Sequence, residues 1–452
     1  MRHPFFAAVL CAGCLALPAH APAAMRLDME GAVMHALQSN PAVESAEHSV
    51  RAAISGRNAA RASFGPTVGV TYGYDRYNKD RASRSERNAT SVTVRLSQPI
   101  FTGFQLLNAS QKAVLQEEYQ RLQLDARRLS IALQTQQAFL SYLKEVESIR
   151  SGRRALERAK SQLALSREAW QLGIKPRLDM LQAEVEVARA ETSLITHENG
   201  RDVWRARLNS LLGIPQAQRV EYQGNLNLHP FGRTLEQCLA CALERRPDLL
   251  MARKSVEIAA RDLGIAQSAF WPQVSAVLGW TSSGSHIGAD GGKYSRKDYS
   301  YANIGLTLSW TLFSSGKRLH LTRQAKHEVK ALEAAVRDAV NNSAYDVRAC
   351  LLSAQDAYRM VKVAQKAVAS ARESYNDAKM RYELQSGTYL ELLTAQSSLS
   401  DAELSEISAR ADCLGAIARL YEAMGEIHPG LEEGKRLPLH EEARAVPGKA
   451  AK

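Results

Sequence analysis

Three short motifs of this chain contain residue types that could carry chemistry, but each lacks the partners which that chemistry needs. Cys238 and Cys241 have the C-x-x-C spacing of redox or metal-binding thiols, yet no histidine pair with ligand spacing accompanies them. His327-Glu328 begins like a zinc-protease motif, although no second histidine follows four residues after the first. Ser315-Gly316-Lys317 lacks the upstream glycine of a phosphate loop. We therefore expect no enzyme activity and no cofactor, and we interpret the thiols as buried and inert.

The N-terminal segment has the pattern of a secretory signal peptide. Arg2 and His3 precede an apolar run over residues 5–17, and small alanines follow it at positions suited to cleavage. We predict a signal peptide over residues 1–24, which directs the rest of the chain to the periplasm or beyond. An alternative is a lipoprotein cleavage box at Cys11-Ala12-Gly13-Cys14 that would acylate Cys14, but a cysteine replaces the usual leucine three residues earlier.

The net charge and the distribution of apolar residues limit which partners this chain can bind and how it can enter a membrane. The formal net charge is +11, but a secreted chain does not meet nucleic acid, so we expect the basic residues to cover solvated helix faces. Past the signal peptide, no apolar run has the roughly 20 residues that a membrane-spanning helix needs. Such a chain can enter a membrane only as a closed β-barrel, because unpaired backbone groups are costly in lipid.

Internal similarity divides the chain into two copies of one unit. Motifs of the first half return in the second half, in the same order and at nearly constant spacing. The pairs are Ser39-Asn40-Pro41 with Arg246-Pro247, Phe64-Gly65-Pro66 with Phe270-Trp271-Pro272, and Leu96–Phe101 with Leu308–Phe313. We predict a first structural repeat over residues 25–213, a linker over 214–233, a second repeat over 234–427 and a disordered tail over 428–452.

Each repeat is predicted to contain a helix, two strands, a very long helix and a shorter helix. Between Gly316 and Gly387 there is no glycine or proline, so a helix there would be roughly 105 Å long at 1.5 Å per residue. We place the long helices over about 104–172 and 317–385, and the shorter ones over about 178–212 and 389–424. A stripe of residues spaced by four and three indicates coiled-coil packing of the second long helix. Its members are Val336, Val340, Ser343, Val347, Cys350, Ala354, Ala357, Val361, Ala364, Val368, Ala371, Tyr375, Ala378 and Tyr382.

Four segments alternate between apolar and polar residues and are predicted as strands, over about 66–77, 90–101, 272–282 and 300–313. Alternation alone would also fit a soluble sheet with one face on a core. A membrane sheet is favoured because the helices pack their apolar stripes on each other and because tyrosine and tryptophan cluster at the strand ends. Four strands cannot close a barrel, so the chain must oligomerise, and three copies would supply twelve strands and a wall of twelve helices.

Nearly all of the mature chain resembles the TolC-type family of outer-membrane channel-tunnel proteins. The segments that carry the resemblance are the paired motifs together with Gln98–Gly103, Trp310–Gly316, Gly173–Asp179 and Gly387–Leu393. The resemblance implies a mostly α fold with a membrane β part: a homotrimer whose 12-stranded β-barrel in the outer membrane is continued by a 12-helix periplasmic α-barrel. It also implies contacts with outer-membrane lipid, a periplasmic adaptor protein and an inner-membrane transporter that supplies the energy.

The resemblance also implies a gate where the helix hairpins converge at the periplasmic tip. Glu391 matches a position of an acidic ring in the family, whose next acidic position is Thr394 here. Tyr382 and Asp179 match residues that hold neighbouring hairpins together in closed channels. The alternative is that Glu391 and Asp179 only begin their short helices, where carboxylates favour the helix dipole. The expected adaptor-docking tips carry Gly173, Leu178, Gly387 and Leu390.

The function expected from the resemblance is a passive export duct of a tripartite efflux or type I secretion system, gated at this tip. The family's arginine partner in the latch falls at Gly387, and Gln385 replaces a usual glycine, so the latch departs from the family pattern. Two alternatives are a periplasmic coiled-coil adaptor, which would usually contain a lipoyl-like β domain, and an adhesin-like structural protein. The residues leave open whether the cargo is a protein or a small molecule.

Overall fold

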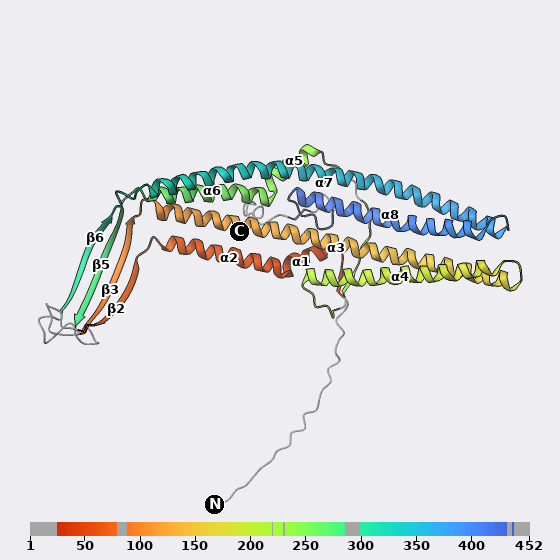
Figure 1. Ribbon diagram of the computed structural model, residues 1–452, viewed down its shortest axis with the longest axis horizontal. Coiled ribbons are helices and arrows are strands. Elements are labelled where there is room, and N and C mark those ends of the chain that lie inside the picture. The colour runs from red at the N-terminus through yellow and green to blue at the C-terminus, as the bar shows by residue number, and fades with distance from the viewer. Residues whose placement is uncertain are drawn as a thin grey trace, which may run out of the picture.

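The computed structural model describes residues 25–78, 88–218, 220–228, 231–284, 299–431 and 436–437. The predicted signal peptide, with Cys11 and Cys14, lies outside the described residues, as do parts of both loops between paired strands and most of the predicted tail. The chain is an elongated bundle of helices with a four-stranded sheet at one end (Figure 1). None of the described helices combines the length and the apolar stretch that crossing a membrane would require.

The elements occur as two similar series, in agreement with the tandem duplication. The first is α1 (Met29–Ser39), α2 (Pro41–Ala62), β2 (Thr67–Arg76), β3 (Asn88–Phe101), α3 (Gln105–Gln171) and α4 (Arg177–Leu212). The second is α5 (Leu235–Arg245), α6 (Pro247–Ser268), β5 (Gln273–Gly284), β6 (Tyr299–Ser309), α7 (Lys317–Glu383) and α8 (Tyr389–Ala423). Strand β6 ends before the expected residue 313, because Trp310 donates from its indole to the Phe270 carbonyl oxygen at 3.1 Å and begins the connection to α7.

Each repeat begins with a helix that a proline divides. Asn40 ends α1 with an extended backbone, and Pro41 starts α2 at a position where its missing N–H needs no partner. The Asn40 side chain accepts from the N–H of Ala42 and donates to the Leu211 carbonyl oxygen at 2.7 Å, which fixes the break against α4. Pro247 produces the same break between α5 and α6.

The helices form a wall one layer thick. Next to the sheet the order of neighbours is α2, α3, α6, α7, and toward the far end α4 and α8 take the places of α2 and α6 (Figure 1). One side of the wall is hollowed along α2, α3, α6 and α7, where many small side chains line a groove. The buried residues of α7, apart from Ala325 and Leu351, all belong to the predicted stripe.

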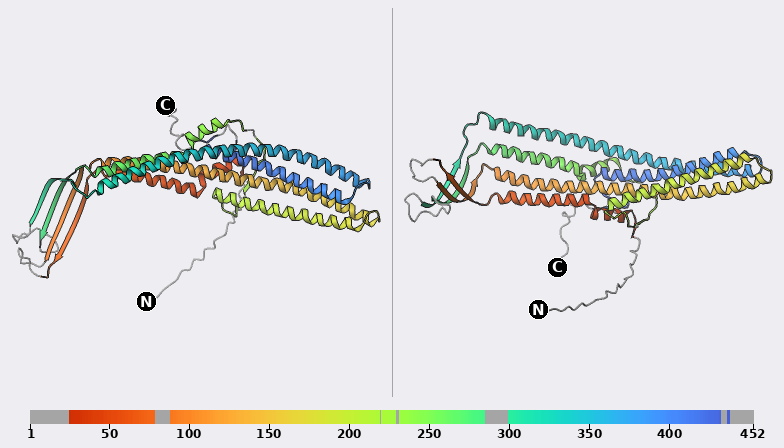
Figure 2. Two further views of the ribbon diagram at one scale, coloured as in Figure 1. Left: turned by 45° about the horizontal axis from the view of Figure 1, so that its top comes forward. Right: turned by 60° about the horizontal axis from the view of Figure 1, so that its bottom comes forward.

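The four strands form one antiparallel sheet in the order β2, β3, β5, β6. Cross-strand rows alternate between its faces, as with Val68, Leu96, Leu278 and Ile304 on one face and Gly69, Arg95, Gly279 and Asn303 on the other. The apolar face is exposed, and the side chain of Ile304 reaches 84% exposure. The sheet extends past the helix ends, and none of the described helices covers either face (Figure 2).

A small parallel strand pair lies near the middle of the bundle. Strand β1 (Met25–Leu27) pairs with β4 (Val220–Tyr222), which falls inside the predicted linker. Tyr222 is buried against Phe139 and Tyr142, with ring centroids 5.9 and 5.5 Å away. Neither strand was predicted from the sequence, because three residues are too few to show an alternating pattern.

The prediction of a disordered tail from residue 428 onward is wrong for residues 428–431. His428 is buried and stacks on Tyr421 with ring centroids 3.9 Å apart, and Leu431 is buried as well. Ile427 and Leu437 form an antiparallel bridge. The charged composition of this region predicted disorder. Composition does not show that residues 427–431 pack against other parts of the chain, such as Tyr421.

Candidate functional site

Both helix hairpins turn at the end of the wall farthest from the sheet, where the expected gate and docking residues lie (Figure 1). Gly173 follows α3 with a φ of 72°, and Gln385 follows α7 with a φ of 61°. After each turn residue, the next backbone N–H donates to a carbonyl oxygen of the last helical turn. Ile174 donates to Ala169 at 2.8 Å, and Ser386 donates to Arg381 at 2.9 Å. Gln385 therefore occupies a left-handed conformation that favours glycine.

The structure brings Asp179 and Tyr382 together. The Tyr382 hydroxyl donates to Asp179 Oδ2 at 3.2 Å and so joins the start of α4 to the end of α7. The Tyr382 ring is buried, packs edge-on against Tyr389 at 5.6 Å between centroids, and lies 4.4 Å from Lys175 Nζ. Burial raises the pKa of Tyr382, so the phenol stays protonated and can donate. This contact links the two hairpins of one chain.

Glu391 and Thr394 do not take part in that contact. Glu391 forms a capping box at the start of α8: its N–H donates to Thr388 Oγ1 at 3.3 Å, and its carboxylate accepts from the Thr388 N–H at 3.4 Å. The Thr394 hydroxyl donates to the Leu390 carbonyl oxygen at 2.8 Å within the same helix. Both residues are exposed. The contacts of Glu391 are those of a helix start, and its carboxylate remains accessible to solvent.

The expected docking residues lie at or beside the two turns. Leu178 and Leu390 are 60% and 63% exposed, Gly173 is exposed, and Gly387 is half-buried. Three more apolar side chains are exposed at the same turns, namely Leu172, Ile174 and Leu384. Five apolar side chains are therefore exposed at the far end of the wall, and clusters of exposed apolar residues can mark protein interaction sites.

A second connection between the hairpins, which was not predicted from the sequence, lies deeper in the wall. Glu403 on α8 is buried, and the Ser151 hydroxyl of α3 donates to its Oε2 at 2.6 Å. Arg158 of α3 and Arg372 of α7 lie 3.7 and 3.9 Å from its carboxylate oxygens. The only signal in the sequence was the matching position Glu191 in the first repeat, which pairs with a lysine at the surface.

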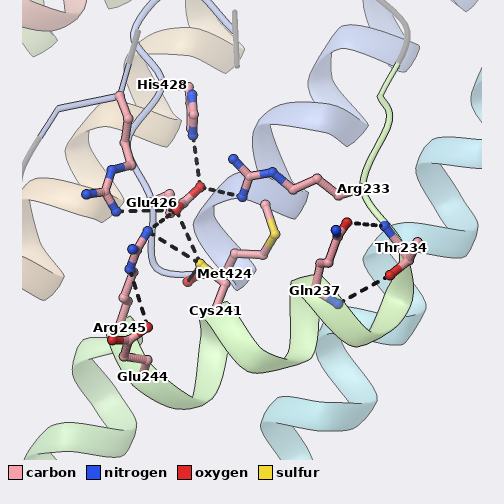
Figure 3. A network of polar contacts seen from close by, with 10 residues as sticks. Arg233, Thr234, Gln237, Cys241, Glu244, Arg245, Met424, Glu426 and His428 are labelled. Carbon is pink, nitrogen blue, oxygen red and sulfur yellow. Dashed lines mark hydrogen bonds and ion pairs between the residues drawn. The ribbon is translucent and has the colours of Figure 1, made fainter. Parts of the chain in front are cut away.

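Cys238 and Cys241 lie on α5 and form no disulfide. Cys238 is buried, and Cys241 donates from Sγ to Glu426 Oε1 at 3.2 Å (Figure 3). Oε2 of the same carboxylate accepts from Arg233 at 2.8 Å and lies 3.0 Å from His428 Nε2. Burial and the neighbouring Glu426 carboxylate raise the pKa of Cys241 to about 11. Cys241 is thus a protonated thiol in a packing network.

Metal binding finds no support in the described part of the chain. Within residues 25–437, excluding the short undescribed gaps, no three His, Cys, Asp or Glu side chains are grouped so that they could hold a metal ion.

Comparison with known proteins identifies the family. The family model for outer membrane efflux proteins matches residues 32–214 and 239–426, once in each repeat. Outer membrane protein TolC of Vibrio cholerae is 23% identical over 425 residues, which cover 89% of this chain and 93% of that protein. The alkaline protease secretion protein AprF of Pseudomonas aeruginosa is 23% identical over 403 residues, covering 85% of this chain and 82% of that protein.

Solved structures agree with the fold. The outer membrane channel CmeC of Campylobacter jejuni superposes with a TM-score of 0.77 at 17% identity, covering 92% of this chain and 88% of that one. The outer membrane protein VceC of Vibrio cholerae gives a TM-score of 0.75 at 18% identity, covering 88% and 96%. These structures confirm the predicted mostly helical fold class. The family match agrees with the predicted outer-membrane location. Because the family model covers most of both repeats, the chain belongs to the outer membrane efflux protein family.

Proposed function

We propose that this chain is one protomer of a trimeric export duct, in which three four-stranded sheets close one β-barrel in the outer membrane. The observation that carries the proposal is the sheet itself, which has an exposed apolar face and no described partner along the outer edges of β2 and β6. Open strand edges are not tolerated in lipid, so neighbouring copies must pair these edges. The apolar face then contacts lipid, and the polar face lines the lumen.

The helical wall supports the same assembly. One open side of the wall is formed by α2 and α4 and lies on the same margin of the protomer as β2. The other open side is formed by α7 and lies on the same margin as β6. Apolar side chains are exposed along these helices, among them Val185, Ile195 and Val203 of α4 and Leu352, Met360 and Val363 of α7. Three protomers joined along these margins form a closed wall that continues the barrel across the periplasm.

In this assembly the apolar hairpin tips face the periplasm and dock onto an adaptor protein, which connects the duct to an inner-membrane transporter. The chain supplies the conduit of an efflux or type I secretion system, and it catalyses no reaction. The Asp179–Tyr382 contact and the exposed Glu391 and Thr394 form the gate at the tips. Support comes from the hydrogen bond between the two hairpins and from the exposed leucines at their turns.

A pair of substitutions on neighbouring residues of β6 tests the proposed faces. Leu306→Arg places a charge on the lipid face, where it costs about 2–4 kcal/mol near the middle of the membrane, and we expect trimer assembly in the outer membrane to fail. Thr307→Arg places the same charge on the lumen face, and we expect the heat-sensitive trimer on gels and the planar-bilayer conductance to persist. Equal tolerance of both variants, or a wild-type protein that is a water-soluble monomer, would contradict the proposal.

A further inference from the structure

The polar face of the sheet carries one charged side chain away from the strand ends. Arg95 lies in the middle of β3 and is exposed. Asp75 is the other charged residue among the described strand positions of this face, and it lies next to the loop end of β2, opposite Ala89. On β2, β3 and β5 the rows between them contain threonine, serine and glycine, and β6 adds Tyr299 and Tyr301, so every residue of these rows is uncharged. Arg95 therefore dominates the charge at its level of the sheet.

The neighbours of Arg95 leave room for its guanidinium. Gly69 on β2 and Gly279 on β5 lie directly opposite it in the two adjoining registers. A Cβ at Gly69 would meet nothing within 4 Å, so the space over that strand is open. At Gly279 the position of a Cβ is occupied by the Asn303 side chain, whose Oδ1 lies 2.5 Å from it. In this row the Arg95 side chain therefore has two glycines as its direct neighbours, and Asn303, next in the row, is uncharged.

Among the described residues, Arg95 also has no anionic partner. No carboxylate of the described chain lies within the 4.0 Å that defines an ion pair with its guanidinium. Arginine remains protonated at any physiological pH, and its planar group binds carboxylates and phosphates through paired hydrogen bonds. A guanidinium that is exposed, unpaired and given free space is available to ions and solutes that pass over this face.

We propose that Arg95 forms a ring of three guanidinium groups that gives the barrel lumen a preference for anions and for cargo with carboxylate or phosphate groups. The proposal rests on the proposed trimer, whose symmetry places the three copies at one height. Rings of arginine or lysine select anions in other pores by the same electrostatics. The screening length is about 10 Å at 0.1 M salt, so each guanidinium acts on ions that pass within about that distance.

Reversal potentials in planar bilayers under a tenfold KCl gradient test the ring. We expect Arg95→Gln to lower the ratio of chloride to potassium permeability roughly threefold relative to the wild type. Arg95→Lys keeps the charge and should keep most of the ratio. Thr71→Gln, a neutral substitution on the same face, should leave the ratio unchanged. The effect of Arg95→Gln should shrink at 1 M salt, where the screening length is about 3 Å.

The comparison with the wild type removes the contribution of acidic residues at the hairpin tips, because all variants share it. A restored ratio in the double variant Arg95→Gln, Thr307→Arg would support a charge ring on this face. If Arg95→Gln trimers conduct with the wild-type reversal potential, the ring is refuted while the proposed duct stands. If the wild-type protein forms no trimer and no conductance, the proposed function itself fails.

Discussion

At the scale of single residues, the tip of the hairpins depends on a few polar contacts. Asp179 and Tyr382 were predicted from the resemblance to a known family, and the structure places them in hydrogen-bond contact. Glu403 and Glu426 could not be predicted, because the sequence around a carboxylate does not reveal which distant helices bury it. Their partners come from segments far apart in the chain, such as Ser151 for Glu403.

Removal of the inter-hairpin hydrogen bond should loosen the proposed gate. Tyr382→Phe deletes the donor to Asp179, and a hydrogen bond of this kind contributes about 1 kcal/mol. We expect a higher single-channel conductance or a longer open time in planar bilayers. Tyr375→Phe is the matched control, because this tyrosine packs beside the same cluster without a bond to Asp179. An unchanged trace for Tyr382→Phe would remove this contact from the gate.

Replacement of Gln385 by glycine should stabilise the second hairpin. Gln385 has a φ of 61°, where a side chain is unfavourable and glycine is not, so we expect a gain of about 1 kcal/mol. The matching turn already contains glycine, and Gly173→Gln should therefore destabilise by a similar amount. Thermal unfolding followed by circular dichroism measures both shifts. A lower midpoint for Gln385→Gly would show that the glutamine side chain contributes a contact of its own.

At the scale of elements, the long helices and the strands of the sheet were predicted correctly because local sequence patterns determine them. Helices α3 and α7 lack proline, contain at most one glycine and repeat an apolar stripe, and their ends lie within two residues of the expected bounds. The strands alternate strictly enough to be recognised. Strands β1 and β4 and the ordered segment after α8 depend on contacts between distant parts of the chain, which no local pattern encodes.

The segment after α8 should become sensitive to acid through Glu426. Burial raises the pKa of this carboxyl, but hydrogen bonds from His428, Cys241 and Arg233 outweigh it and lower the pKa well below 4.5. The folded state therefore binds this proton less readily than the unfolded state. The stabilisation is complete above about pH 4.5 and is lost as the pH falls below it. Hydrogen exchange of residues 426–431 should show the loss of protection.

Substitution of the same carboxyl provides the control for that acid effect. Glu426→Gln removes the buried carboxylate that pairs with Arg233 and Arg245, and loss of one partner of a buried ion pair costs about 3 kcal/mol. We expect the variant to exchange rapidly in this segment even at pH 7, with little further change in acid. Cys241→Ser should behave nearly as the wild type. Protection that persists in Glu426→Gln would assign the segment's order to the packing of His428 on Tyr421 alone.

At the scale of the whole molecule, the number of strands carried more information than any single motif. A sheet too small to close on itself predicts an oligomer, because open strand edges are not tolerated in lipid. The number three rested on the resemblance, since neither strand spacing nor composition fixes it. The order of the strands across the sheet could not be predicted from alternation. This order places the edge strands β2 and β6 on the same margins of the protomer as the outer helices.

Helices α3 and α7 each contain 67 residues and begin at equivalent joints with the sheet. At 1.5 Å per residue both descend about 100 Å, so the two turns of a protomer finish level with each other. In the proposed trimer all six turns therefore lie at one level, and two similar kinds of turn alternate around the end that we propose binds the adaptor. We expect one kind of adaptor surface to fit both turns, which differ in that Gln385 occupies the position of Gly173.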